Sequence, residues 1–231
     1  QPGKRPFEWA PYELVVDSPD KGVKAKAEEA ASITTPLIDS IRAAERELII
    51  VSPYFVPLKS GVEGLAGLEE RGIEVTVITN NQFTVHGGYA PSRKPLLEAG
   101  VEIYEVRPDA DVAGTEFIDS SGAKATLHTK AFIVDDKEVF IGSFNFDPRS
   151  GNLNTELGVI IRDPELALIY TVLVEDALPK QTFEVFLNED GKLRWRGYED
   201  GEEIIYDKEP ETTWGERTKA WFARIIPKSQ L

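Results

Sequence analysis

Residues 128–156 read HTKAFIVDDKEVFIGSFNFDPRSGNLNTE and carry the clearest structural and chemical pattern in the chain. Two apolar runs predict strands over Leu127–Asp135 and Glu138–Ser143, and the tight connection at Asp136-Lys137 predicts a hairpin between them. A further apolar run predicts a third strand over Leu157–Arg162. This part of the chain is therefore expected to be rich in β-structure.

Upstream of this region, apolar runs of strand length alternate with segments of helical periodicity. Apolar residues recur at helical spacing within 27–47, where Thr35 and Pro36 are the expected N-cap and first-turn pair. Such alternation is typical of a sheet covered by helices, an α/β fold. The other elements predicted here are strands at Glu13–Asp17, Glu47–Val51, Ile73–Thr79 and Val101–Val106, and helices at Val62–Arg71 and Tyr89–Ala99.

The C-terminal part predicts a helix over Pro164–Leu178, a hairpin of Gln181–Leu187 with Lys192–Gly197, and a strand segment at Glu203–Asp207. A last helix, Trp214–Ile226, has an aromatic side flanked by basic residues. This helix either packs on the sheet, which we favour, or lies at a lipid interface. The expected organisation is a linker and entering strand (1–26), a main domain (27–180), and a hairpin and amphipathic helix packed on that domain (181–231).

The composition excludes several kinds of site. The 231 residues include no Cys and two His, which excludes disulfides and thiolate–metal sites and argues against a His-rich metal site. The formal net charge of −14 argues against a general nucleic-acid binder, because such proteins need a basic field. The chain begins at Gln1 and contains no Met, which indicates a processed form or an excised domain of a longer protein.

Five residues of the central stretch suit phosphoryl chemistry. His128 and Lys130 are two residues apart, so on a strand both side chains lie on one face. Ser143 and Asn145 have the same spacing, and their hydroxyl and amide groups suit the oxygens of a phosphoryl group. An imidazole at such a site needs a partner that fixes its tautomer, and Glu156 is the acid expected there.

The order His128-x-Lys130-x4-Asp135, followed by Gly142-Ser143-x-Asn145, resembles the HKD motif of the phospholipase D superfamily. The resemblance covers most of the chain and points to the bacterial cardiolipin synthase branch, the cardiolipin synthase C-like group. It implies the mixed β-sheet of that superfamily, flanked by helices on both faces, with one HKD half in this chain. The segments that carry it are SPYFVP (52–57), VHGGY (85–89), LEAGVEIYE (97–105), IGSFNFDPRS (141–150) and NTE (154–156).

The resemblance also implies a role for each residue of the motif. His128 would either attack phosphorus and form a phosphohistidine or protonate the leaving alcohol. Lys130 and Asn145 would bind the phosphoryl oxygens, with Ser143 assisting, and Glu156 would hydrogen-bond the catalytic imidazole. No metal or other cofactor is implied.

Weaker expectations attach to six other residues. Asp135 has odd parity relative to His128 and lies at a turn, so a structural role is expected, and neighbouring Gly142 permits close backbone approach. His86 is expected in a loop near the sheet edge, where it either helps to position a lipid headgroup or caps a helix. The residues that would join it in binding substrate are Tyr54, Tyr89 and Arg149, although a structural ion pair is favoured for Arg149.

The chain has one HKD motif, whereas the chemistry of the superfamily needs two. We therefore expect the C-terminal catalytic half of a cardiolipin synthase, inactive or weak alone, that transfers phosphatidyl groups from phosphatidylglycerol or a similar phospholipid. A missing N-terminal half or a second copy would supply the second His. The expected location is the bacterial inner membrane, peripherally, or its cytoplasmic side. Two alternatives stay open: a homodimeric phosphodiesterase or nuclease of the same superfamily, and a non-catalytic lipid-binding module.

Overall fold

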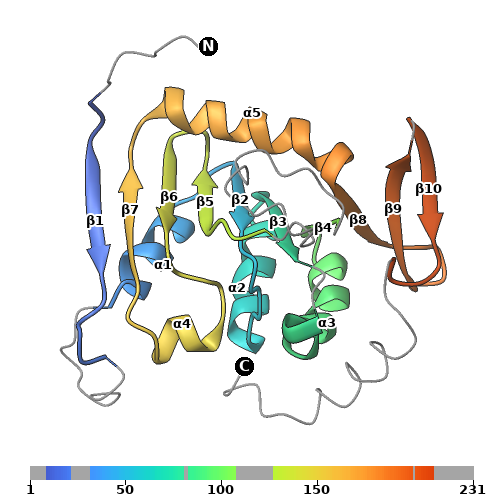
Figure 1. Ribbon diagram of the computed structural model, residues 1–231, viewed down its shortest axis with the longest axis horizontal. Coiled ribbons are helices and arrows are strands. Elements are labelled where there is room, and N and C mark those ends of the chain that lie inside the picture. The colour runs from blue at the N-terminus through green and yellow to red at the C-terminus, as the bar shows by residue number, and fades with distance from the viewer. Residues whose placement is uncertain (1–8, 22–31, 81–82, 108–126, 200, 211–231) are drawn as a thin grey trace, which may run out of the picture.

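A computed structural model describes residues 9–21, 32–80, 83–107, 127–199 and 201–210, with the backbone alone for 83–87. Within it, ten strands form one sheet in the order β1-β7-β6-β5-β2-β3-β4-β8-β9-β10 (Figure 1). The pairs β2–β3 and β3–β4 are parallel, and the other neighbouring pairs are antiparallel. The prediction of a mixed sheet with flanking helices is confirmed.

The strands are β1 (Tyr12–Val16), β2 (Glu47–Val51), β3 (Glu74–Asn80), β4 (Glu102–Val106), β5 (Ala131–Val134), β6 (Glu138–Gly142), β7 (Leu157–Ile161), β8 (Thr182–Leu187), β9 (Leu193–Glu199) and β10 (Glu202–Tyr206). The helices are α1 (Thr34–Arg42), α2 (Lys59–Glu69), α3 (Phe83–Glu98), α4 (Pro148–Asn152) and α5 (Pro164–Gln181).

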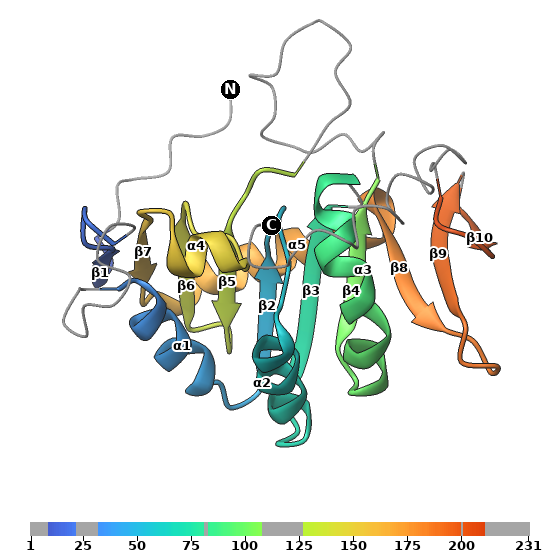
Figure 2. The ribbon, with the colours of Figure 1, turned by 90° about the horizontal axis from the view of Figure 1, so that it is seen from below.

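Alternate residues of the central strands belong to two separate cores. Leu48 and Ile50 of β2 pack in the core that also contains buried residues of α1, α2 and α3. Ile49 and Val51 belong to the second core, which contains Ala167 of α5. Successive side chains of a strand point to opposite faces, so β2 is buried on both. Helices α1, α2 and α3 therefore cover one face of the sheet and α5 crosses the other (Figures 1 and 2).

The C-terminal strands extend the same sheet. β8 pairs antiparallel with β4, and β9 and β10 continue outward as a meander. Figure 1 shows this hairpin at one edge of the sheet and β1 at the other. The helix predicted over Trp214–Ile226 lies outside the described residues.

Several predicted boundaries differ from the structure. The strand predicted over Leu127–Asp135 is regular only over β5, so His128 and Lys130 precede the strand. α3 begins at Phe83 rather than Tyr89, which places His86 on a helix and not in a loop. α1 begins at Thr34 with Ile33 at the N-cap and no side-chain cap, so the role predicted for Thr35 is wrong.

Candidate active site

His128 and Lys130 lie in the segment that leads into β5. Asn80, the last residue of β3, binds the backbone just before them: its Nδ2 donates to Leu127 O at 3.0 Å, and its Oδ1 accepts from Leu127 N at 3.1 Å. The Lys130 carbonyl accepts from Gly142 N at 3.1 Å. The backbone that carries the two side chains is therefore fixed by both β3 and β6.

The Lys130 ammonium is buried beside the His128 imidazole. Its Nζ donates to His128 O at 2.7 Å and lies 3.5 Å from His128 Nδ1. The two side chains therefore meet, although they precede the strand. Burial lowers the pKa of Lys130, while the carboxylates of Glu156 and Asp147 act in the opposite direction. His128 itself is exposed and accessible to a ligand.

Ser143 and Asn145 follow the end of β6. A Cβ added at Gly142 would lie 2.5 Å from Leu157 O and 2.7 Å from Phe140 Cζ, so the close approach of β7 requires this glycine.

The Asn145 Oδ1 is buried and has no hydrogen-bond partner in the part of the chain that the structure describes. A buried acceptor left unpaired costs free energy. This atom is therefore suited to a donor from a ligand or from a second protein segment.

Glu156, just before β7, binds two serine hydroxyls. Its Oε1 accepts from Ser150 Oγ at 2.8 Å, and its Oε2 accepts from Ser143 Oγ. Across the described residues it makes no hydrogen bond to His128, the contact that the superfamily resemblance implied. In this structure Glu156 instead links Ser143 to α4, and its negative charge acts on Lys130.

The short helix α4 carries a second carboxylate into this group. Asp147 is its N-cap and accepts from Ser150 N at 2.7 Å, with Pro148 at the first helical position. Burial raises the pKa of Asp147 and the nearby Glu156 raises it further, against the N–H groups of Ser150 and Arg149. The sequence prediction missed this residue, although an Asp followed by Pro is a typical helix start.

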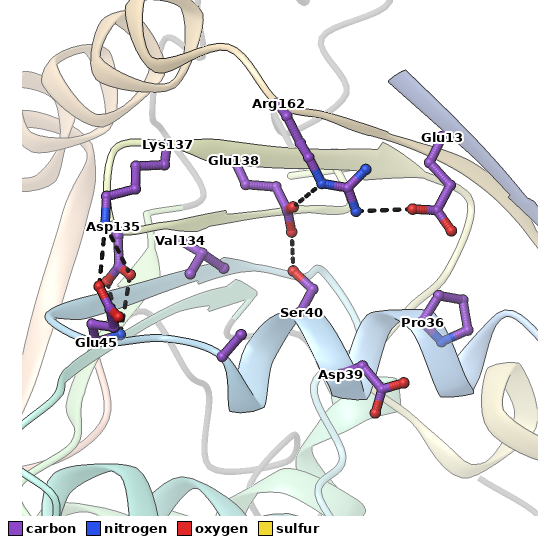
Figure 3. Close-up of a pocket in the computed structure, with 11 residues that line it drawn as sticks. Glu13, Pro36, Asp39, Ser40, Glu45, Val134, Asp135, Lys137, Glu138 and Arg162 are labelled. Atoms are coloured by element: carbon purple, nitrogen blue, oxygen red, sulfur yellow. Dashed lines mark hydrogen bonds and ion pairs between the residues drawn. The ribbon is translucent and has the colours of Figure 1, made fainter. Parts of the chain in front are cut away.

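Asp135, the third letter of the motif, lies at the opposite end of β5 from His128. Its carboxylate accepts from the backbone N–H groups of Glu45, Arg46 and Glu47 at 2.8–3.2 Å. Although burial opposes the shift, these donors lower the pKa of Asp135. Asp135 lines a pocket of about 550 Å³ at this end. Figure 3 shows several charged side chains around it, among them Glu45 and Lys137.

The remaining predicted residues lie in different surroundings. Tyr54 is 41% exposed after β2. Tyr89 is buried, and its hydroxyl donates to Glu105 Oε1 at 3.0 Å, so it joins α3 to β4 in the interior. Arg149 is exposed on α4 and forms no ion pair with the described residues. His86 is placed on α3 by its backbone alone.

Neither a metal-type cluster nor a membrane-spanning helix occurs among the described residues. No group of three or more His, Cys, Asp or Glu side chains there is arranged to hold a metal ion. No helix in those ranges combines the length and apolar character needed to cross a bilayer.

The chain is similar to several known proteins. Residues 37–176 match the family model described as "Cardiolipin synthase, PLD-like domain". Cardiolipin synthase C of Escherichia coli K12 is 36% identical over 238 residues, which cover 99% of this chain and 50% of that protein. Cardiolipin synthase A of Proteus mirabilis is 31% identical over 153 residues, 65% of this chain and 28% of that protein. The chain thus spans half the length of cardiolipin synthase C.

Solved structures share the fold. Nuc, a phospholipase D family member from Salmonella typhimurium, superimposes with a TM-score of 0.57 at 17% identity, over 77% of this chain and 99% of that chain. A phosphatidylserine synthase from Haemophilus influenzae Rd KW20 gives a TM-score of 0.52 at 18% identity, over 74% of this chain and 39% of that chain. Because the family model spans more than half of the residues, this chain belongs to the cardiolipin synthase type of phospholipase D-like domains.

Proposed function

We propose that this chain is one catalytic half of a bacterial phosphatidyltransferase of the cardiolipin synthase type. One observation carries the proposal: the exposed imidazole of His128 and the buried ammonium of Lys130 lie side by side, 3.5 Å apart, in the segment that leads into β5. An imidazole beside a fixed cation suits nucleophilic or acid–base work on a phosphodiester.

The proposed reaction has two balanced steps. One imidazole nitrogen bonds to phosphorus while the bond from phosphorus to the leaving alcohol oxygen breaks, and an opposite imidazole gives that oxygen a proton. An acceptor hydroxyl then attacks phosphorus, its proton passes to the second imidazole, and the phosphorus–nitrogen bond breaks. His128 supplies one of the two imidazoles. The Lys130 ammonium and the amide N–H groups of Asn145 stabilise the negative charge that develops on the phosphoryl oxygens.

An apolar cavity beside the site favours a lipid substrate over a nucleic acid. It has a volume of about 750 Å³ and lies between α1, α2 and the segment that contains Asn145. The lining of this cavity includes Phe144, Phe146 and Pro148, which are close to Asn145 in the sequence. The net charge of −14 adds electrostatic repulsion of a polyanion. Phosphatidylglycerol or a similar phospholipid is the proposed donor, and a peripheral position at the bacterial inner membrane is the proposed location.

The test measures phosphatidyl transfer between phosphatidylglycerol molecules in vesicles by the longest natural polypeptide that contains this chain. We expect His128→Ala to lower kcat by about 1000-fold or more, because the imidazole takes part in both steps. Lys180→Met on the exposed face of α5 is the control and should keep the wild-type rate. Transfer by His128→Ala at the wild-type rate would overturn the proposal.

The half-site part of the proposal has its own test. The residues at this site supply one imidazole, so we expect the isolated monomer to show no His128-dependent transfer. Sedimentation establishes the oligomeric state in the assay. Measurable transfer by a monomer would show that one motif is enough.

A homodimeric phosphodiesterase is the second candidate, because the fold matches Nuc over 99% of that chain. If the protein is such an enzyme, it forms a stable dimer and cleaves single-stranded DNA in a reaction that depends on His128. A monomer that leaves DNA intact would exclude it.

A further inference from the structure

Two charged side chains that follow β1 form a buried ion pair behind the candidate active site. Asp17 Oδ2 and Lys21 Nζ are 2.7 Å apart, and their side chains are 0% and 9% exposed. Neither residue belongs to the HKD motif, and both precede the range 37–176 that matches the family model. Buried Asp and Lys residues are rare in proteins unless they are paired.

The hydrogen bonds of the pair reach several elements around the site. Asp17 Oδ1 accepts from Ile33 N at 3.0 Å, at the start of α1. Asp17 Oδ2 accepts from Glu156 N at 2.9 Å, and Asp17 N donates to Glu156 O at the same distance. Lys21 Nζ donates to Ser150 O at 2.8 Å. The pair therefore connects β1, α1, α4 and β7.

The contacts continue into the candidate active site. Lys21 holds the backbone of Ser150, and Asp17 holds the backbone of Glu156 on both its N–H and its carbonyl. The hydroxyl of Ser150 in turn donates to Glu156, whose other carboxylate oxygen binds Ser143. The network thus reaches from the first strand to a residue of the predicted phosphoryl site.

The stability of the fold alone does not explain why these two charges are buried as a pair. A buried ion pair is often no more stabilising than apolar side chains of the same volume, because both charges lose their hydration. What the pair supplies is geometry: an ammonium and a carboxylate accept few alternative arrangements when buried. A carboxylate that binds both Ser143 and Ser150 benefits from this constraint.

We propose that the Asp17–Lys21 ion pair is a positioning element of the active site, which holds Glu156 and Ser150 in the orientation that phosphoryl transfer requires. The reaction part of this inference rests on the proposed function, whereas the geometric part does not. Asp17 and Lys21 touch neither substrate nor reacting atoms in this arrangement, so they act through Glu156.

The experiment compares Lys21→Met and Lys21→Arg with the wild type in the longest natural polypeptide. Lys180→Met is the matched control, because Lys180 and Asp176 also form an i,i+4 pair, at 2.6 Å, on an exposed helix face. Val185→Ala removes buried volume on β8 and is the control for lost stability. Melting temperature, kcat and KM for phosphatidyl transfer, and hydrogen exchange of the Glu156 amide are measured for each.

We expect Lys21→Met to lower kcat roughly 10- to 100-fold with KM changed by less than about twofold, because Glu156 loses its fixed direction. Lys21→Arg restores the cation and should recover most of kcat. The Glu156 amide should exchange faster in Lys21→Met than in Val185→Ala, even where the two melt at the same temperature. Lys180→Met should match the wild type throughout.

Three results would overturn the inference. The first is a wild-type kcat for Lys21→Met. The second is an equal loss of kcat for Val185→Ala at the same melting temperature. The third is an unchanged exchange rate of the Glu156 amide in Lys21→Met, which decides the geometric part without any activity. If the wild type itself shows no His128-dependent transfer, the proposed function fails, and the amide exchange still decides whether the pair positions Glu156.

Discussion

At the scale of single residues, the HKD motif divides into two groups that lie at opposite ends of β5. Lys130 is buried against the His128 carbonyl and imidazole. Asp135 is bound instead by three backbone N–H groups of the chain entering β2. Asp135 also adopts φ of +54°, in the left-handed region that Asp tolerates better than most residues. Its backbone therefore forms part of the turn between β5 and β6, while its carboxylate fixes the segment that enters β2.

We predict that Asp135→Asn lowers the free energy of unfolding at pH 7 by about 1–3 kcal/mol, because an amide places a donor against backbone donors. The folded pKa of Asp135 lies below its unfolded value, so its stabilisation is present above the unfolded pKa and is lost as pH falls through the folded pKa. The difference between variant and wild type should therefore shrink on acidification. Urea unfolding between pH 7 and pH 3 measures it.

The matched control for this variant is Asp176→Asn, an exposed carboxylate on α5 that pairs with Lys180. Its removal should change stability by less than about 1 kcal/mol. A loss at Asp135 that stays the same from neutral to acid pH would contradict a role for the carboxylate charge.

At the scale of elements, the candidate active site depends on how β3 ends. Asn80 is buried, and its side-chain amide donates to and accepts from the backbone of Leu127. The segment that carries His128 is therefore held by an amide at the end of β3, before β5 becomes regular. Such a contact fixes the direction from which the imidazole approaches a ligand.

We predict that Asn80→Asp lowers kcat for phosphatidyl transfer roughly 10- to 100-fold, because it replaces the donor to Leu127 O by a second acceptor. Hydrogen exchange of the Leu127 amide should accelerate at the same time. Thr76→Ala, a polar deletion near the start of the same strand, should leave both quantities unchanged. Faster exchange at Leu127 with full kcat would show that this clamp does not affect catalysis.

The elements also show what a sequence can and cannot predict. β2 is predicted with its observed bounds, because a run buried on both faces is continuously apolar. The meeting of His128 with Lys130 follows from local spacing. The contacts of Asp17 with Glu156 and of Asn80 with Leu127 join residues 139 and 47 positions apart. No local periodicity encodes such pairs, so the supporting residues of the site had to come from the structure.

At the scale of the whole molecule, a buried charged cluster joins the two sides of the predicted boundary near residue 180. Glu105 of β4 is fully buried and accepts from Tyr89 Oη at 3.0 Å and Trp195 Nε1 at 2.9 Å. Arg93 of α3 lies 2.7 Å from Glu105 and 3.1 Å from Glu209, beyond β10. The cluster thus ties α3 and β4 to the C-terminal strands.

We predict that Arg93→Met destabilises the protein by about 3–5 kcal/mol at pH 8, because it leaves Glu105 buried without its cation. Burial already raises the pKa of Glu105 and Arg93 counteracts the rise, so losing Arg93 raises that pKa further. A raised folded pKa gives stability that is present below the unfolded pKa and lost as pH rises through the folded one. The variant should therefore regain stability between pH 8 and pH 5, as measured by urea unfolding.

The double variant Arg93→Met with Glu105→Gln should recover much of the loss at pH 8, since the unpaired buried charge is gone. Arg194→Met is the control on the same hairpin, because its partner Asp207 is 82% exposed, and it should cost less than about 1 kcal/mol. If the cluster joins 181–210 to the rest of the sheet, every variant unfolds in a single transition. A separate early transition confined to β9 and β10 would show that the hairpin is an independent unit.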